Sequence, residues 1–248
     1  MHWFDTIDST NDQLKKLAIS GAPHGTVLVA GHQTKGRGRM GRSFHCPKEK
    51  GLYLSALLRP NCPAEALMHL TCAAAIAAED AIELVTGFRP SVKWINDLVA
   101  QNKKLGGILT ELSVDTKTGI AQSAVIGIGI NCNQAQQDFP LELQDIAISL
   151  QTVTGSPVSI DRLAAALITS LQTCASTLLS KKSGIMAKYR RDCITLGRDI
   201  AVLQGDAKRY GTAQDINEDG SLIVRFQDGI VESVCSGEVS VRGMYGYV

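Results

Sequence analysis

The spacing of apolar and polar residues divides the chain into two parts. Up to about residue 196, stretches with helical spacing of apolar residues alternate with short apolar runs of the kind that form strands. Beyond that point only short strand-like segments occur, separated by polar turns. We therefore expect a larger unit at residues 1–196 and a small one at 197–248.

The first part combines helices and strands. Leu14, Leu17 and Ala18 form an apolar stripe, which predicts a helix that begins near Ser9 and ends at Gly21. Further helices are predicted at 63–86, 160–180 and 184–193, and strands at 26–30, 52–58, 91–100, 105–113 and 121–130. The last of these strands is apolar almost throughout, as expected for a central strand.

The second part predicts only strands, at 199–203, 208–213, 222–226, 230–235 and 239–242. Polar turns such as 217–220 separate them. Short strands at this close spacing are typical of a small barrel.

Composition and charge narrow the class of protein. The 248 residues include 25 Lys and Arg against 24 Asp and Glu, a net charge of +1, which argues against a surface that binds DNA or an anionic membrane as a whole. The N-terminus lacks a signal-peptide pattern, and the most apolar helix carries a polar face, so we expect a cytoplasmic protein without a membrane span. Seven cysteines without a C-x-x-C pair indicate reduced thiols.

A loop rich in Gly and Arg follows the first predicted strand. Its segment 36–41 matches G-x-G-x-x-G, but neither a helix nor an acidic residue follows where a dinucleotide site requires them. The favoured interpretation is an anion-binding loop, in which Arg37, Arg39 and Arg42 offer guanidinium groups to carboxylate or phosphate. A solvated basic turn and an RNA-binding Arg-Gly segment remain open.

Two lysines lie near each other in a predicted hairpin. Lys93 ends one apolar strand with Asn96 and Asp97 just beyond it, and Lys104 precedes the next strand. In a hairpin these side chains are neighbours, although each alone suits an ordinary strand end or turn. Several cations around one point repel one another unless an anion lies among them.

Five segments in this order resemble the biotin–protein ligases, also called biotin–[acetyl-CoA-carboxylase] ligases, in the form without an N-terminal DNA-binding domain. They are 8–11, Gln33 with 36–39, 93–98, 104–108 and 127–131. The likeness runs from about Phe4 to Arg242, with Ile95 where the family usually has Pro and Met40 where it often has Arg or Trp. The resemblance implies an α+β fold: a mixed β-sheet with helices on one side, related to class II aminoacyl-tRNA synthetase and lipoate ligase domains, and a small C-terminal SH3-like β-barrel.

The resemblance also implies a reaction. ATP and Mg²⁺ would convert biotin to biotinyl-5′-AMP, from which biotin passes to a lysine of a biotin carboxyl carrier protein. The residues implied to bind biotin are Ser9, Thr10, Asn11, Gln33, Gly36, Arg37, Gly38, Arg39, Lys104 and Gly107. Those implied to bind ATP or the adenylate are Arg37, Arg39, Arg42, Lys93, Asn96, Lys104 and Asn131. The implied catalytic residues are Lys104, which bridges carboxylate and phosphate, Arg39, Lys93 and Asp97, which orients or deprotonates the acceptor amine.

Two alternatives stay open at this point. One is a lipoate– or octanoate–protein ligase on the same fold, and the other is a non-catalytic regulator that binds nucleic acid. Neither a DNA nor a membrane partner is expected, a homodimer is left open, and the pattern names no metal ligands.

Overall fold

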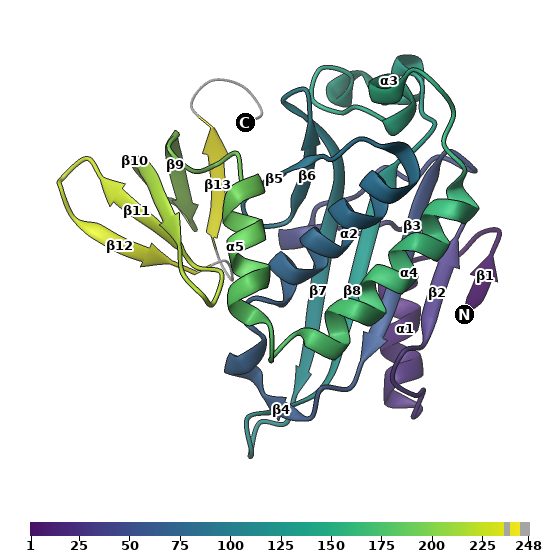
Figure 1. Ribbon diagram of the computed structural model, residues 1–248, viewed down its shortest axis with the longest axis horizontal. Coiled ribbons are helices and arrows are strands. Elements are labelled where there is room, and N and C mark those ends of the chain that lie inside the picture. The colour runs from purple at the N-terminus through teal and green to yellow at the C-terminus, as the bar shows by residue number, and fades with distance from the viewer. Residues whose placement is uncertain (236–238, 244–248) are drawn as a thin grey trace.

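The computed structural model describes residues 1–235 and 239–243, which form two β-sheets with helices packed around the larger one (Figure 1). The helices are α1 (Thr10–Ile19), α2 (Leu70–Thr86), α3 (Leu150–Thr154), α4 (Ile160–Thr177) and α5 (Lys182–Asp192). The larger sheet holds β1 (His2–Phe4), β2 (Val27–Ala30), β3 (Gly51–Leu58), β4 (Cys62–Pro63), β5 (Ser91–Lys93), β6 (Asp97–Ala100), β7 (Lys103–Val114) and β8 (Ile120–Asn131). The smaller sheet holds β9 (Asp199–Gln204), β10 (Ala207–Ile216), β11 (Leu222–Phe226), β12 (Val231–Val234) and β13 (Val239–Gly243).

The larger sheet is mixed, as predicted. Its strand order is β1-β2-β3-β8-β7-β6-β5, with β4 paired to β8. β1 runs parallel to β2, whereas β3, β8 and β7 in the centre are antiparallel to one another. The short elements β1, β4 and α3 were not predicted, because two to five residues are too few to show a period.

Alternation along the strands sends side chains to two helix layers. Val27 and Val29 of β2 belong to the core beneath α2 and α4, whereas Leu28 between them packs with Leu14 and Ala18 of α1. The two layers lie on opposite faces of the sheet, with α2 and α4 in front in Figure 1 and α1 behind. The prediction of helices on one side therefore holds for α2 and α4 but not for α1, because the first strands are apolar on both faces and the second face also needs cover.

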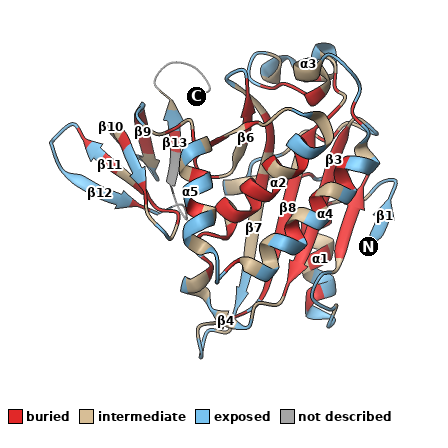
Figure 2. Cartoon of the chain, in the orientation of Figure 1, coloured by how far each residue is buried: buried red, intermediate tan, exposed pale blue. Residues whose placement is uncertain are grey.

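The helix α2 is among the most deeply buried elements. It is rich in alanine, and most of its residues are buried between the sheet, α4 and α5 (Figure 2). Gly87, with a φ of 72°, ends the helix in the left-handed conformation, as the sequence predicted.

The segment 91–100 forms two strands rather than the one that was predicted. β5 and β6 pair across a tight turn, so that Lys93 lies opposite Asp97. The sequence pattern does not reveal this turn, because Trp94 and Ile95, which form it, are as buried as strand residues. The peptide bond between Trp94 and Ile95 is cis. Asn96 fixes the turn against β7, since its amide donates to the Ile108 carbonyl at 3.0 Å.

The smaller sheet begins at Asp199, close to the predicted boundary. Its strand order is β12-β11-β10-β9-β13, and all its described pairs are antiparallel. In the part of the chain that the structure describes, β12 and β13 do not pair with each other, so the predicted SH3-like barrel is not confirmed as a closed one. Residues 236–238 and 244–248 of this predicted unit lie outside the described residues.

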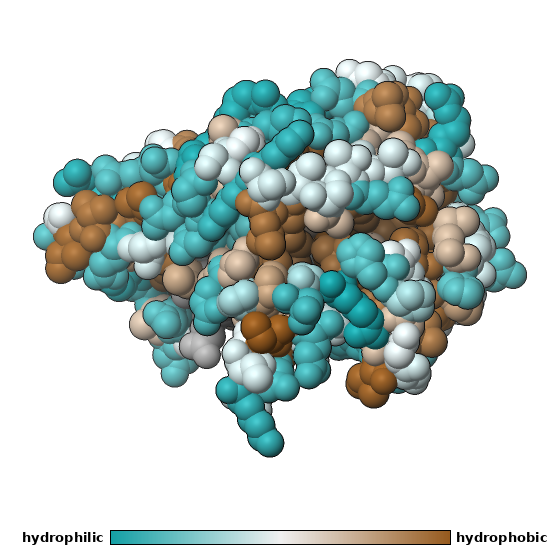
Figure 3. Space-filling model, turned by 60° about the horizontal axis from the view of Figure 1, so that its bottom comes forward, coloured by the Kyte–Doolittle hydropathy of each residue, from teal (hydrophilic) through white to brown (hydrophobic). Residues whose placement is uncertain are grey.

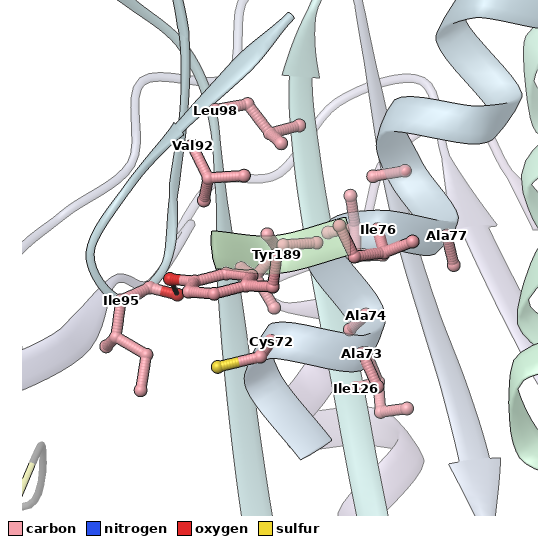
Figure 4. Close-up of a cluster of buried hydrophobic side chains, with 14 of the residues drawn as sticks. Cys72, Ala73, Ala74, Ile76, Ala77, Val92, Ile95, Leu98, Ile126 and Tyr189 are labelled. Carbon is pink, nitrogen blue, oxygen red and sulfur yellow. Dashed lines mark hydrogen bonds between the residues drawn. The ribbon is translucent and has the colours of Figure 1, made fainter. Parts of the chain in front are cut away.

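The two sheets are joined through the β5–β6 turn. The Trp94 indole donates to the Gly220 carbonyl at 2.9 Å, and the Trp94 amide donates to Thr195 Oγ1 at 2.9 Å. From α5, the buried Tyr189 hydroxyl donates to the Ile95 carbonyl at 2.9 Å, beside Cys72 and the alanines of α2 (Figure 4). The turn is thus held by the second sheet, the linker and α5 together.

Among the described residues, every helix is too short or too polar to cross a bilayer. Hydrophilic residues cover most of the face in Figure 3, with hydrophobic ones exposed in small groups between them. All seven cysteines are free thiols in this structure.

Candidate active site

A cavity of about 300 Å³ lies on the face of the larger sheet that carries α1. The Gly-Arg loop, the β5–β6 turn, the segment 139–147 and strand β13 surround it. It is lined by all the predicted site residues except Gly36: Ser9, Thr10, Asn11, Gln33, Arg37, Gly38, Arg39, Arg42, Lys93, Asn96, Asp97, Lys104, Gly107 and Asn131. The fold therefore brings predicted residues from Ser9 to Asn131, 122 positions apart in the sequence, to one cavity.

Glycines form the floor of the cavity. A Cβ atom on Gly127 would overlap the Asn11 side chain, and one on Gly129 would come within 2.7 Å of the Phe44 ring. Since these contacts are too close for any side chain, the glycines let α1 and the Gly-Arg loop approach the sheet. Gly36 serves the loop itself, because a Cβ there would overlap the Phe44 carbonyl and the Cys46 sulfur.

One end of the cavity carries neutral hydrogen-bonding groups. Gln33 Oε1 accepts from the Thr10 amide at 2.8 Å and the Thr10 hydroxyl at 3.0 Å. Ser55 Oγ lies 2.7 Å from Thr10 Oγ1 and 2.5 Å from Asn11 Oδ1. Asn11 donates to the Leu109 carbonyl at 3.2 Å, which fixes the orientation of its amide. These buried groups orient one another and are suited to a polar, uncharged ligand.

Two serines lie at this end of the cavity; the role of Ser9 was predicted from the sequence and that of Ser55 was not. Ser9 caps α1, since its side chain accepts from the Asp12 amide at 3.4 Å, and this confirms the predicted helix start. Ser55 is buried behind Thr10 and Asn11 and supports them without lining the cavity itself, and the sequence did not predict this role. The available signal was its position as the one hydroxyl side chain directed at α1 from the otherwise apolar run of β3.

The other end of the cavity is cationic. Lys104 Nζ lies 2.6 Å from Asp97 Oδ1, and Arg39 Nη1 donates to Asn96 Oδ1 at 3.3 Å. Asp97 is the one carboxylate among the described lining residues. Lys93 lies opposite it on the neighbouring strand, 6% exposed.

Burial lowers the pKa values of two of these cations, Lys93 and Arg39, and nearby like charges contribute. Burial, together with Arg242, Lys104 and Arg42, lowers the pKa of Lys93 to about 8, although Asp97 opposes the shift. Burial also lowers the pKa of the Arg39 guanidinium. A bound anion would favour the charged form of Lys93, so this end of the cavity is built to receive negative charge.

The backbone around Lys104 is fixed by its neighbours. Its amide donates to the Ile146 carbonyl at 2.7 Å, and its carbonyl accepts from the Ile148 amide at 2.9 Å. Asn131 is buried, and its amide donates to the Ile148 carbonyl at 3.1 Å and lies 3.4 Å from the Lys104 carbonyl. The side chain of Asn131 therefore supports Lys104 from behind.

One wall of the cavity, and a cation that reaches it from the second sheet, are not predicted by any pattern in the sequence. The wall consists of Phe139, Leu143, Ile146 and Ala147, in a segment of short turns without a period. Arg242, with its neighbour Val241, reaches the cavity from β13. Contacts between distant units leave no local pattern, so no signal in the sequence placed Arg242 here.

Arg37 lies differently from the other loop arginines. It lines the cavity, but its Nη1 atom is 2.5 Å from Asp12 Oδ1 and 3.2 Å from Glu111 Oε1. Carboxylates of α1 and β7 thus already balance its charge. Its predicted contact with biotin or the adenylate stays a prediction.

Comparison with known proteins agrees with this geometry. Residues 3–131 match the biotin/lipoate A/B protein ligase family, and residues 195–242 match the biotin protein ligase C-terminal domain. A bifunctional ligase/repressor BirA of Bacillus spizizenii is 36% identical over 231 residues, which cover 91% of this chain and 69% of the relative. A biotin–[acetyl-CoA-carboxylase] ligase of Mycobacterium tuberculosis is 34% identical over 221 residues, covering 86% of this chain and 79% of the relative.

A solved structure extends the likeness to the whole fold. The biotin protein ligase from Aquifex aeolicus in complex with biotin and ATP has a TM-score of 0.82 and 31% identity, with 97% of each chain covered. By its sequence, its fold and its two matching domains, the chain belongs to the biotin protein ligases of the biotin/lipoate A/B protein ligase family.

Proposed function

We propose that the protein is a biotin–[acetyl-CoA-carboxylase] ligase, which activates biotin with ATP and transfers it to a lysine of a biotin carboxyl carrier protein. The observation that carries the proposal is a single cavity with a neutral, hydrogen-bonding end and a buried cationic end. This polarity matches a ligand with a neutral ring and a carboxylate that must meet a phosphate.

The neutral end suits the ureido ring of biotin. Ser9, Thr10, Asn11 and Gln33 would hydrogen-bond the ring, with Ser55 holding two of them in place. Gly36 and Gly38 shape the loop above it, and Gly107 leaves room beside Lys104, whose Nζ would lie 3.4 Å from a Cβ at that position. The apolar chain of biotin would lie along the glycine floor.

The cationic end suits the reacting groups. Attack of the biotin carboxylate on the α-phosphate of ATP forms the acyl–phosphate bond of biotinyl-5′-AMP and releases pyrophosphate. Lys104 is the cation that would bridge carboxylate and phosphate, with Arg39, Arg42 and Lys93 around the phosphates. Positive groups that are fixed before the reaction stabilise the charge that develops on the phosphate.

Magnesium fits this site as a companion of the nucleotide. Within residues 1–235 and 239–243, no three His, Cys, Asp or Glu side chains gather as a metal site. Of the lining residues that the structure describes, Asp97 is the one that offers a carboxylate to the cavity. Mg²⁺ is often held by one carboxylate and substrate phosphates, and when bound it would supply further charge neutralisation there.

The second step needs an acceptor lysine amine. Attack of that amine on the acyl carbon forms the amide and releases AMP, and the amine must lose a proton to do so. Asp97 is the candidate to orient the amine or accept the proton, once the phosphate competes with it for Lys104. The free thiols and the use of ATP support a cytoplasmic location.

The test is mass spectrometry of a biotin carrier domain after incubation with the protein, ATP and biotin. We expect a gain of one biotinyl group on one lysine that requires both ATP and this protein. Release of pyrophosphate with lipoate or octanoate but not with biotin would contradict the proposal and identify the protein as a lipoate-type ligase. Sedimentation of the same sample determines whether the protein forms the homodimer that the sequence left open.

A further inference from the structure

Four charged side chains meet beside the Gly-Arg loop. Arg37 Nη1 lies 2.5 Å from Asp12 Oδ1 and 3.2 Å from Glu111 Oε1. Lys15 Nζ lies 2.9 Å and 2.8 Å from the same two oxygens. One arginine and one lysine thus share the two carboxylates of Asp12 and Glu111, which we call the acidic pair.

The members of this cluster differ in how they are anchored. Asp12 and Lys15 belong to α1 and Glu111 to β7, so three of them sit on regular elements of the core. Arg37 belongs to the loop between Gln33 and Cys46. Its contact with the acidic pair therefore ties the loop to the core.

The loop is braced within itself. The Gly38 amide donates to the Arg42 carbonyl at 2.7 Å, and the Phe44 amide donates to the Gly36 carbonyl at 2.9 Å. Such a loop can move as one piece about its base. Side chains that reach from it to the core, such as Arg37, then set the balance between closed and open positions.

We propose that Arg37 and the acidic pair form a latch that holds the loop over the cavity, and that Lys15 takes over the acidic pair when the loop opens. The role of the latch in the reaction rests on the proposed function, because a closed loop would keep biotinyl-5′-AMP from water.

The presence of Lys15 makes the latch reversible. Without it, release of Arg37 would leave two neighbouring carboxylates without a cation, which is unfavourable. With Lys15 on the same oxygens, one of the two negative charges stays compensated in the open position. Both carboxylates are ionised, since the cations hold the pKa values of Asp12 and Glu111 below their usual range although burial raises them.

Glu111 connects the latch to the neutral end of the cavity. While Oε1 faces Arg37 and Lys15, Oε2 accepts from the Asn11 amide at 3.0 Å. A substitution of Glu111 would therefore disturb the ligand pocket as well. Asp12 and Lys15 are the positions at which the latch can be changed with the least effect on the cavity.

Trypsin cleavage of the native protein without ligands tests the latch directly. The loop carries Lys35, Arg37, Arg39 and Arg42, so cleavage there, identified by mass spectrometry, measures how often it opens. Half-exposed ion pairs are worth a few tenths to about 1 kcal/mol, so we expect D12N to raise loop cleavage about two- to fivefold. K15Q should lower it by a similar factor, because Arg37 then holds the acidic pair alone.

The control is K16Q, which removes the exposed lysine next along α1 and outside the cluster. We expect loop cleavage in K16Q to equal that of the unchanged protein. Cleavage that is unchanged in both D12N and K15Q, or that shifts in the same direction in both, would overturn the latch. Opposite shifts cannot come from a general loosening of α1, which would accelerate cleavage in both variants.

Retention of the intermediate gives a second readout. With biotin and ATP, D12N should leak free biotinyl-5′-AMP about two- to fivefold faster, and K15Q more slowly, at unchanged rates of pyrophosphate formation in the first turnover. Absence of any pyrophosphate in the unchanged protein would count against the proposed function and leave the cleavage result to decide the latch. Equal leakage in all variants that do form adenylate would contradict its role in the reaction.

Discussion

Two of the cations around the cavity, Lys104 and Arg37, are paired with carboxylates of the protein. Lys104 has Asp97 at 2.6 Å, and Arg37 has Asp12 and Glu111. From the sequence alone, a ligand anion is the expected partner of these cations. Because the protein supplies partners of its own, a bound phosphate must compete with Asp97 for Lys104, and binding rearranges an existing pair.

Removal of the bridging ammonium tests the assignment of Lys104. We expect K104M to form biotinyl-5′-AMP at least a hundredfold more slowly, since fixed charges at a reacting group are worth a few kcal/mol. Asp97 would also lose its ion-pair partner, so D97N is combined with K104M to separate the two effects. Adenylate formation at the normal rate in K104M, measured by pyrophosphate release, would refute the bridging role.

The lowered pKa of Lys93 predicts a pH dependence of stability. The pKa of Lys93 is about 8 in the folded protein and near its ordinary value of about 10.4 in the unfolded chain. Between these two pH values the unfolded state binds more protons, so the free energy of unfolding rises with pH. K93M has no ammonium to bury, so its free energy of unfolding should not change with this titration. The free energy of unfolding of the unchanged protein should rise relative to that of K93M by about 2 kcal/mol between pH 7 and pH 9.5. Urea unfolding of both proteins at the two pH values measures it, and a constant difference would contradict the shift.

At the scale of elements, periodic segments were predictable and contacts between them were not. The helices α1, α4 and α5 and most of the predicted strands lie within a few residues of their predicted ranges, because each buries one or both faces in a regular pattern. The helix α2 ends where predicted but begins at Leu70 rather than at residue 63. The turn within 91–100 is formed by the buried, apolar Trp94 and Ile95 rather than by the polar residues that usually mark a turn, so the pattern predicts one continuous strand there. The wall at 139–147 had no period, and whether the second sheet closes depends on pairing of its edges, which no local pattern reveals.

Gly127 and Gly129 of β8 form the floor of the cavity and let α1 and the Gly-Arg loop lie close to the sheet. In G129A the new methyl group would lie 2.7 Å from Phe44, so the loop must move away from the sheet. Overpacking of this kind costs about 1–3 kcal/mol, and we expect biotin to bind tenfold or more weakly in calorimetry. G184A is the control, because nothing lies within 4 Å of a Cβ at that helical position. Equal affinity in the two variants would contradict the role of the floor.

At the scale of the whole molecule, the second sheet completes the cavity. The linker after α5 pairs with β5, where the Ile194 amide donates to the Val92 carbonyl at 2.9 Å. The Trp94 indole joins the end of that strand to Gly220, in the turn between β10 and β11. The turn that carries Asn96 and Asp97 is therefore positioned by both units, and β13 places Arg242 at the cationic end.

Arg242 gives a direct test of this shared site. In R242Q we expect ATP to bind about tenfold more weakly while biotin affinity stays within twofold, since one cation is lost at the phosphate end only. The pKa of Lys93 should rise, because Arg242 is one of the like charges that lower it. The control is R225Q, which removes an exposed arginine of β11 outside the cavity. If calorimetry finds the same ATP affinity in R242Q and R225Q, the second sheet does not contribute charge to nucleotide binding. If biotin affinity falls as far as ATP affinity in R242Q, the substitution has disturbed the whole cavity and the division into two chemically distinct ends is wrong.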